Sequence, residues 1–338
     1  MLSFQGISQK KNSNPDQIEG KFKFTPLPYF DYNTSVGYSI GFLPIVTMNL
    51  SEKDTISPSA TVGALVMYSE NKAWFGVAFG SFYVDEDNWR INFAAGKGDF
   101  NFQFYANNPI SKWFKYNTDA DFSYLGVQRK IIPNLYGGLS YVHTTFKTTV
   151  EGESESSSLN GIGFDLLWDT RSSVNYPRRG YFIEADYTMY PTSFGNTEAS
   201  NQLTMEYNHF YSSRKNKDVI ATRLYTGLGI GEVNFNQQFV VGDTDIRGYS
   251  TGKHRGNYLV ALQGEYRYNF HESFGAVGFA GVATLYGANN PVDEGRLLPG
   301  VGVGLRYTFL KDTHSNIGFD IAKGDGDWGF YFRISESF

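Results

Sequence analysis

One stretch of the sequence combines residue types that can fix a long loop in place: Val241-Gly242-Asp243-Thr244-Asp245-Ile246-Arg247-Gly248-Tyr249. It lies in a connection of residues 229–256 that shows no strand pattern, and loops of that length are usually functional or disordered. If the loop folds inward, Arg247 needs a carboxylate, because an unpaired buried charge is very costly. Glu265 offers one, Gly248 permits close backbone approach, and Tyr249 can pack on a wall. The alternative is a flexible surface loop with an incidental arginine.

Other residue types that do chemistry form no convincing group. Nucleophilic catalysis needs a Ser and a His close together with a supporting acid. His143 and His209 fall on predicted strands, His271 and His314 in turns, and His254 in the long loop, and none has such neighbours. We therefore predict that the chain is not an enzyme. A membrane-embedded enzyme, such as a phospholipase, is the least favoured of three function hypotheses.

Acidic pairs that resemble calcium ligands occur at three places: Asp243 with Asp245, Asp85 to Asp87, and Asp325 to Asp327. None reproduces a full oxygen-ligand loop, and turn chemistry explains the same residues equally well. The chain has no cysteine, which excludes disulfides and thiolate metal sites. We predict no metal and no cofactor.

The elements that must position the loop are strands of about ten residues in which apolar and polar side chains alternate. In the last of them Phe330, Phe332, Ile334 and Phe338 share one face, opposite Tyr331 and Arg333. Sixteen such segments are predicted: 35–47, 57–68, 72–84, 88–96, 99–107, 118–131, 134–148, 158–171, 179–190, 200–214, 218–229, 257–270, 273–286, 298–310, 314–323 and 328–338. An even number is what single-chain bacterial barrels require.

Composition narrows the class further. The 338 residues carry a net charge of −5, which gives no footprint for nucleic acid, and no apolar run approaches the roughly 18 residues of a membrane-spanning helix. Aromatic residues make up 17% of the chain, and many large polar side chains occupy the second strand face. Both features favour an all-β, sixteen-stranded antiparallel transmembrane β-barrel in a lipid bilayer over a soluble sandwich or propeller.

Connection lengths predict the topology. Short links recur at 70–72, 96–98, 132–133, 216–218, 271–273 and 311–314, with longer loops between them. Short turns mark the periplasmic rim and long loops the cell surface, so both termini are predicted to be periplasmic. Residues 1–34 are predicted to be a short periplasmic segment, and residues 35–338 the barrel. No signal peptide is visible, so the chain is expected to be a mature or recombinant form from the outer membrane of a Gram-negative bacterium.

With these motifs in place, the sequence resembles the superfamily of outer-membrane assembly and transport barrels that includes BamA-type barrels and two-partner-secretion transporters. In that family the sixth extracellular loop enters the lumen with a Val/Ile-Arg-Gly-Phe/Tyr motif, to which Ile246-Arg247-Gly248-Tyr249 corresponds. The resemblance implies that Arg247 pairs with Glu265. The family's second acidic position, on the thirteenth strand, is replaced by Gly281-Val282-Ala283, whereas Gly318-Phe319-Asp320 matches.

The resemblance also bears on assembly and domain content. A last strand with Phe330, Phe332, Ile334 and a final Phe338 is the insertion signal that barrel-assembly machinery recognises, so this chain is expected to be a client of that machinery. Family members that insert or secrete proteins carry periplasmic POTRA domains, and about 34 residues are too few for one. The chain thus resembles a POTRA-less subgroup.

Two further function hypotheses follow from the resemblance. In the first, the barrel inserts or translocates outer-membrane proteins through a seam between its first and last strands, weakened by Gly37, Gly41 and Gly329. In the second, it is a pore or a scaffold for partner lipoproteins. Client barrel proteins, lipoproteins and lipopolysaccharide are the expected partners.

Overall fold

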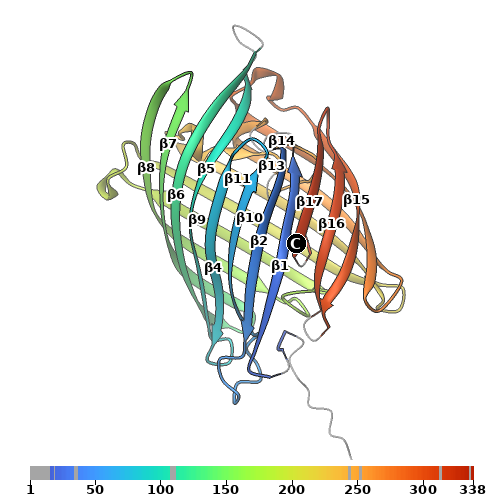
Figure 1. The fold of residues 1–338 in the computed structure, drawn as a ribbon. Coiled ribbons are helices and arrows are strands. Elements are labelled where there is room, and N and C mark those ends of the chain that lie inside the picture. The colour runs from blue at the N-terminus through green and yellow to red at the C-terminus, as the bar shows by residue number, and fades with distance from the viewer. Residues whose placement is uncertain are drawn as a thin grey trace, which may run out of the picture.

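The protein is described by a computed structural model covering residues 16–18, 20–33, 37–106, 112–242, 245–250, 253–311, 314–334 and 336–338. One antiparallel sheet contains all its strands (Figure 1). They are β1 (Phe22–Asn33), β2 (Gly37–Met48), β3 (Ala60–Ser69), β4 (Trp74–Val84), β5 (Trp89–Ala106), β6 (Lys112–Ile132), β7 (Leu135–Val150), β8 (Glu153–Asp169), β9 (Gly180–Tyr190), β10 (Ser200–Ser213), β11 (Asp218–Gly231), β12 (Phe239–Val240), β13 (Arg255–Asn269), β14 (Phe274–Ala288), β15 (Leu298–Leu310), β16 (Ser315–Lys323) and β17 (Trp328–Ile334). The 3₁₀ helices η1 (Thr192–Phe194), η2 (Phe235–Gln237) and η3 (Pro291–Asp293) lie in connections. No helix in these described ranges has the length and apolar character needed to span a membrane.

The sheet closes into a barrel because β1 pairs with β17 as well as with β2. Sixteen long strands form the wall described here, and the two-residue β12 pairs only with the start of β13. The predicted sixteen-stranded antiparallel barrel is therefore confirmed. With an even number of strands, β1 begins and β17 ends at the same rim, which we call the terminal end. The opposite rim, where residues 232–254 connect β11 to β13, is called the loop end.

Alternation along the strands separates an apolar outer face from a polar lumen. On β15, Val301, Val303 and Leu305 are 58–63% exposed, whereas Arg306 on the other face is 5% exposed. On β13, Leu262 faces outward while Gln263, Glu265 and Arg267 are buried inside. An outward row of large apolar side chains is the surface that a barrel presents to lipid.

The barrel begins earlier in the sequence than predicted. Residues 22–33, assigned to a periplasmic segment, form β1 and pair with β2 along twelve register positions. Pro26 and Pro28 conceal this strand in the sequence, because proline cannot donate to a sheet ladder and is confined to edges. In the structure both prolines lie opposite β2 but have no register partner in β17, so their missing N–H groups cost the barrel little.

A second prediction was wrong because it divided one strand into two. The segments 88–96 and 99–107 are one strand, β5, and Gly96 and Gly98 are not a turn but pair continuously with β4 and β6. Aromatic rings occupy the space that side chains there would fill: Phe122 lies over Gly96 and Phe100 over Gly98. Missing β1 lowered the predicted count by one and dividing β5 raised it by one, so the predicted number of sixteen strands was right.

These errors also change the rim assigned to some turns. The connection that contains Glu70–Lys72 lies between β3 and β4 at the loop end, not at the rim of the termini. The connections at 133–134, 214–217, 270–273 and 311–314 do lie at the terminal end. A long connection, residues 170–179 between β8 and β9, also lies there, and we call it the terminal-end loop.

The terminal-end loop is held by the N-terminal segment. The Asp16 carboxylate accepts hydrogen bonds from the Ser173 hydroxyl at 2.6 Å and from the Val174 N–H at 2.9 Å. Within the loop, Tyr176 is buried against Phe210 and Val219 of the lumen wall. Segments far apart in the sequence therefore meet at this rim.

Candidate functional site

The described part of the connection between β11 and β13, which falls within the loop proposed at residues 229–256, turns into the lumen. Val241, Ile246 and Tyr249 are at most 2% exposed and pack in one apolar cluster with inward-facing residues of β13, β14 and β15. The hydroxyl of Tyr249 donates to the Pro299 carbonyl at 2.6 Å. The loop is therefore part of the protein's core.

Glycines on the lumen wall make room for this loop. A Cβ at Gly300 would lie 2.4 Å from the Arg247 carbonyl oxygen, and one at Gly281 would lie 2.9 Å from Ile246 Cγ2. Such distances are shorter than side chains tolerate. The Gly281–Ala283 stretch thus receives Ile246.

Arg247 is placed between two carboxylates. Its Nη2 pairs with Glu265 on β13, and its Nη1 lies 2.5 Å from Oδ2 of Asp320 on β16. Its Cζ lies 3.3 Å from the centroid of the Phe279 ring, which gives a cation–π contact. Arg247, Glu265 and Asp320 are 2–3% exposed, so these pairs lie where little water screens them.

The two carboxylates belong to a larger network of charges on the wall. Arg267 Nε lies 2.7 Å from Glu265 Oε1, and Arg306 Nη1 lies 2.5 Å from Asp320 Oδ1. Two more residues extend the network. Glu336 lies 2.9 Å from Arg306, and Arg333 lies 3.4 Å from Asp320. Without the loop, three wall arginines face three wall carboxylates, so Arg247 is a fourth cation that only the loop supplies.

The structure brings together Ile246, Arg247, Gly248, Tyr249 and Glu265, the five residues predicted as a loop lock. Sequence reasoning missed Asp320 as the second acid. Alternation along the segment 314–323 places Asp320 on the lumen face. Its pairing with Arg247 could not be predicted, because the sequence does not show that β16 lies opposite the loop. A further buried group, Arg90 with Asp87 and Asp169, was not anticipated at all.

The predicted insertion signal divides between two environments. Phe330 is 46% exposed on the outer face, and Phe332 contacts Phe319 and Tyr29. The side chain of Ile334 lies outside the described residues. Phe338 does not continue the outer face, because β17 ends at Ile334 and the chain turns inward.

Phe338 packs instead inside the terminal end of the lumen. Its ring contacts Phe210, at 6.4 Å between centroids, and the Arg267 guanidinium lies 5.8 Å from its centroid. Nη2 of Arg267 also donates to the Phe338 backbone oxygen at 2.6 Å. The C-terminus, marked within the outline of the barrel in Figure 1, is thereby linked to the same network as Arg247.

Truncating this ring should loosen the terminal end. Phe338→Ala is expected to lower the free energy of unfolding by about 1–2 kcal/mol, because a half-buried ring loses its apolar and cation–π contacts. Heat-dependent gel mobility in detergent measures the change. Tyr211→Ala, which removes a ring from the opposite face beside Phe210, is the control and should have an effect below about 0.5 kcal/mol. Equal effects of the two substitutions would contradict the inward packing.

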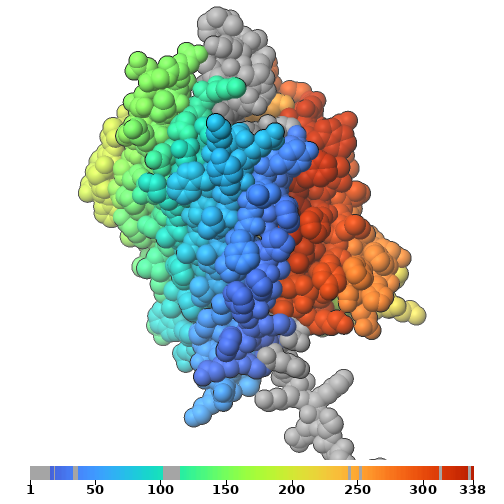
Figure 2. Space-filling view, viewed as in Figure 1, coloured from blue at the N-terminus to red at the C-terminus, as the bar shows by residue number. Residues whose placement is uncertain are grey.

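The seam between the first and last strands is the weakest junction of the wall described. β1 and β17 share two register pairs, Tyr32 with Phe330 and Asn33 with Gly329, whereas β1 and β2 share twelve and β16 and β17 share seven. Figure 2 shows β1 beside β17 on one face of the molecule. The seam is thus paired only near the loop end.

Of the three glycines predicted at the seam, one lies there. Gly329 of β17 pairs with β1, but Gly37 and Gly41 belong to β2, one strand away, because β1 was missed. A Cβ at Gly41 would lie 2.4 Å from the Val66 carbonyl oxygen, so this glycine permits close approach of β3.

No group of three or more metal-ligating side chains occurs among the residues that the structure describes. Asp243, one of the acids considered for calcium, lies outside them. Asp245 accepts a hydrogen bond from the Gly242 N–H at 2.9 Å, as expected for turn chemistry.

Fold and site together define a membrane-type β-barrel whose lumen holds an inward-folded loop anchored by an arginine. The chain matches the Omp85 superfamily domain over residues 6–338 and belongs to that superfamily. Barrels of this superfamily are outer-membrane proteins of Gram-negative bacteria and act as transporters or assembly factors. No curated protein sequence matches the chain.

Solved structures agree on the fold. BamA from Haemophilus ducreyi lacking POTRA domains 1–3 has a TM-score of 0.61 and 14% identity, covering 92% of this chain and 70% of that one. CdiB from Escherichia coli has a TM-score of 0.66 and 12% identity, covering 92% and 62%. CdiB from Acinetobacter baumannii has a TM-score of 0.61 and 13% identity, covering 93% and 60%. The chain thus spans less than two thirds of either CdiB chain.

Proposed function

We propose that this Omp85 barrel assists the insertion or translocation of outer-membrane polypeptides, and that the β1–β17 seam is where they act. The terminal end then faces the periplasm, where unfolded client barrel proteins or lipoproteins arrive, and the loop end faces the cell surface and its lipopolysaccharide. The observation that carries the proposal is the short pairing of β1 with β17, two register positions in the described strands.

An unpaired strand edge is a template for another strand. Along Phe24–Phe30, β1 has no register partner among the described residues of β17, and a client strand that pairs with this edge extends the sheet by strand addition. The contacts that cover the seam are side-chain contacts: Tyr29 with Phe332 at 5.9 Å and Tyr32 with Phe330 at 5.7 Å between ring centroids. Aromatic contacts of this kind stabilise by about 0.5–1.5 kcal/mol each, which thermal opening can overcome.

The docked loop supports this proposal over a passive pore. Buried side chains of Val241, Ile246 and Tyr249 fill the lumen beside β13 to β15, where an open channel would need water. Planar-bilayer recordings separate the two: steady large currents indicate a pore, whereas small fluctuating currents indicate a lumen occupied by the loop.

A reversible cross-link at the seam tests the proposal. The chain has no native cysteine, so Tyr32→Cys with Phe330→Cys gives one defined disulfide between register partners on the same face. We expect oxidation to slow the insertion of a urea-denatured outer-membrane barrel into vesicles by at least about tenfold, with recovery on reduction. The readout is the heat-resistant gel mobility of the client.

The matched control joins two other lipid-facing register partners, Leu305→Cys with Phe319→Cys on β15 and β16. This cross-link should leave client insertion unchanged, because those strands are fully paired. The proposal is wrong if the seam cross-link has no more effect than the control, or if vesicles with the uncross-linked barrel insert clients no faster than empty vesicles. Unchanged levels of all other outer-membrane barrels after depletion of the protein would argue against it in cells.

A further inference from the structure

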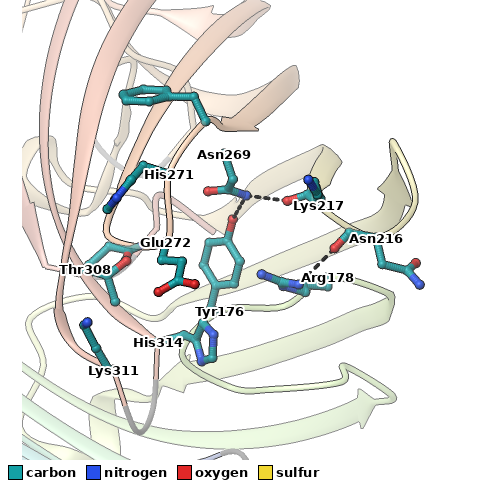
Figure 3. A pocket seen from close by; sticks show the side chains of 12 residues that line it. Tyr176, Arg178, Asn216, Lys217, Asn269, His271, Glu272, Thr308, Lys311 and His314 are labelled. Atoms are coloured by element: carbon teal, nitrogen blue, oxygen red, sulfur yellow. Dashed lines mark hydrogen bonds between the residues drawn. The ribbon is translucent and has the colours of Figure 1, made fainter.

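The terminal end contains a cavity that neither the loop nor the seam explains. Its volume is about 680 Å³, and described residues of four connections line it, among them Arg178, Lys217, His271 and His314. Figure 3 shows Tyr176 of the terminal-end loop between the His271–Glu272 turn on one side and Lys217 on the other. Cavities of this size hold small organic ligands.

The charged side chains that line this cavity are mainly cationic. Among the described residues of the lining, Arg178, Lys217 and Lys311 contribute three positive charges, and Glu272 is the single carboxylate. A neighbouring cavity of about 290 Å³ shares Arg178 and adds Arg179, again without a carboxylate. This local excess of positive charge stands against a net charge of −5 for the chain, so it does not follow from composition.

These cations are not neutralised by the surrounding protein. Neither Lys217 nor Lys311 forms a side-chain ion pair with any described residue, and Arg178 uses one N–H on the Asn216 carbonyl at 2.9 Å. Partial desolvation and the nearby Arg178 guanidinium hold the pKa of His314 below its usual range.

Neutral polar groups complete the lining. Tyr176 is 5% exposed, and its hydroxyl oxygen accepts a hydrogen bond from Asn269 Nδ2 at 2.8 Å, so its own hydrogen is available to a ligand. Its ring stacks on His314 with an interplanar angle of 20°. Asn316, also buried, lies on the same cavity. A buried hydroxyl donor behind a cationic rim is suited to a multiply charged anion. The amides of Asn269 and Asn316 hold the wall in place, because they donate to the Lys217 carbonyl oxygen and to Glu336.

We propose that this cavity binds a phosphate group carried by a soluble or lipid-borne ligand. A phosphate monoester carries about −1.5 to −2 charges at pH 7, which matches the excess of two positive charges among the described residues of the larger cavity. Arg178 supplies planar paired donors, while Lys217 and Lys311 supply point charges, the two modes by which proteins hold phosphate. None of its described lining residues belongs to the seam, and it adjoins the Arg247 network, because Asn316 Nδ2 donates to Glu336 Oε1 at 2.8 Å.

Titration of the purified barrel in detergent with inorganic phosphate tests the proposal, with chloride at matched ionic strength as the reference anion. Wild type should show saturable binding by calorimetry, and Lys217→Ala with Lys311→Ala should weaken it at least about tenfold. Lys53→Ala, which removes an exposed lysine from the β2–β3 connection at the same rim, should bind like wild type. Heat-dependent gel mobility confirms that each variant is folded.

A second arm identifies the carrier. Phosphatidic acid in mixed micelles, compared with phosphatidylcholine, should displace inorganic phosphate if the natural ligand is a lipid, and should fail to displace it if the ligand is soluble. The proposal is overturned if phosphate shows no saturable binding, if chloride binds equally well, or if the double lysine variant binds phosphate as wild type does.

Discussion

Replacing Arg247 by alanine should free the lumen loop and lower the free energy of unfolding by about 2–4 kcal/mol. The substitution removes two charge-assisted contacts, to Glu265 and Asp320, from a site that is 2–3% exposed. Breaking a buried pair usually costs 3–5 kcal/mol because one charge is left unpaired. Here the cost is expected at the low end, since Arg267 still pairs with Glu265 and Arg306 with Asp320.

The same reasoning predicts that removing the wall acid does more harm than removing the loop arginine. Glu265→Gln leaves the four arginines of the network facing two carboxylates. Arg267 then keeps its hydrogen bond to the Phe338 backbone oxygen, but its remaining carboxylate contact is a distant one, with Glu336 at 3.7 Å. We therefore expect Glu265→Gln to destabilise the barrel more than Arg247→Ala, although both break the same contact. Equal losses of stability in the two variants would mean that the wall arginines and carboxylates do not balance one another without Arg247.

Two measurements separate loop release from global loss of stability. The temperature at which the compact gel band converts to the unfolded band should fall for Arg247→Ala, and channel conductance should rise at temperatures where the barrel stays folded. Arg296→Ala is the matched control, because its ion pair with Asp325 at the same rim is 44% and 51% exposed. Exposed pairs contribute at most about 1 kcal/mol. An unchanged gel transition and conductance for Arg247→Ala would show that no lock exists.

The second large effect is expected from Gly248→Ala, which changes no charge. Gly248 has φ of +111°, and a Cβ there would lie 2.7 Å from the Lys323 carbonyl carbon and 2.8 Å from the Gly324 nitrogen. Backbone atoms cannot yield as a flexible side chain does. Strain from the positive φ and overpacking together should cost about 2–4 kcal/mol.

Because the Gly248 N–H also donates to the Tyr331 hydroxyl of β17 at 2.9 Å, this substitution should loosen the contact of the loop with the last strand. Limited proteolysis of the loop from the loop end measures the release. Gly264→Ala on β13 is the control, since a Cβ there meets no atom within 4 Å. If both variants resist protease equally, close approach at Gly248 does not position the loop.

Alternation of side chains determined most of the barrel wall. Runs such as Val301, Val303 and Leu305 assign the outer face of β15 without reference to any other strand, because side chains on a strand point to opposite faces in turn. The same parity placed Glu265 in the lumen, and the isolated Arg247 in a long loop then indicated its partner. These predictions need only the order of residues along one strand or loop, which can be read from the sequence.

Local patterns misled where distant segments compensate for an unfavourable residue. Pro26 and Pro28 indicate no strand, but they fit β1 because its other edge has almost no register partner in β17. Gly96 and Gly98 indicate a turn, but rings of Phe122 and Phe100 cover them within a continuous strand. For the prolines, the decisive neighbour is β17, which closure of the barrel brings near, whereas for the glycines it is a ring of the same strand or of the adjacent β6.

The sequence by itself determined the class of fold, the lumen-facing residues and the arginine of the loop, because strand alternation and an isolated charge are properties of short segments. Tertiary structure alone decided that Asp320 is the second partner of Arg247, that Phe338 turns inward, and that four connections form one cationic cavity. The physical reason is that charge pairing and ring packing depend on distance in space, and closure of a sixteen-stranded sheet joins residues that lie tens to hundreds of positions apart.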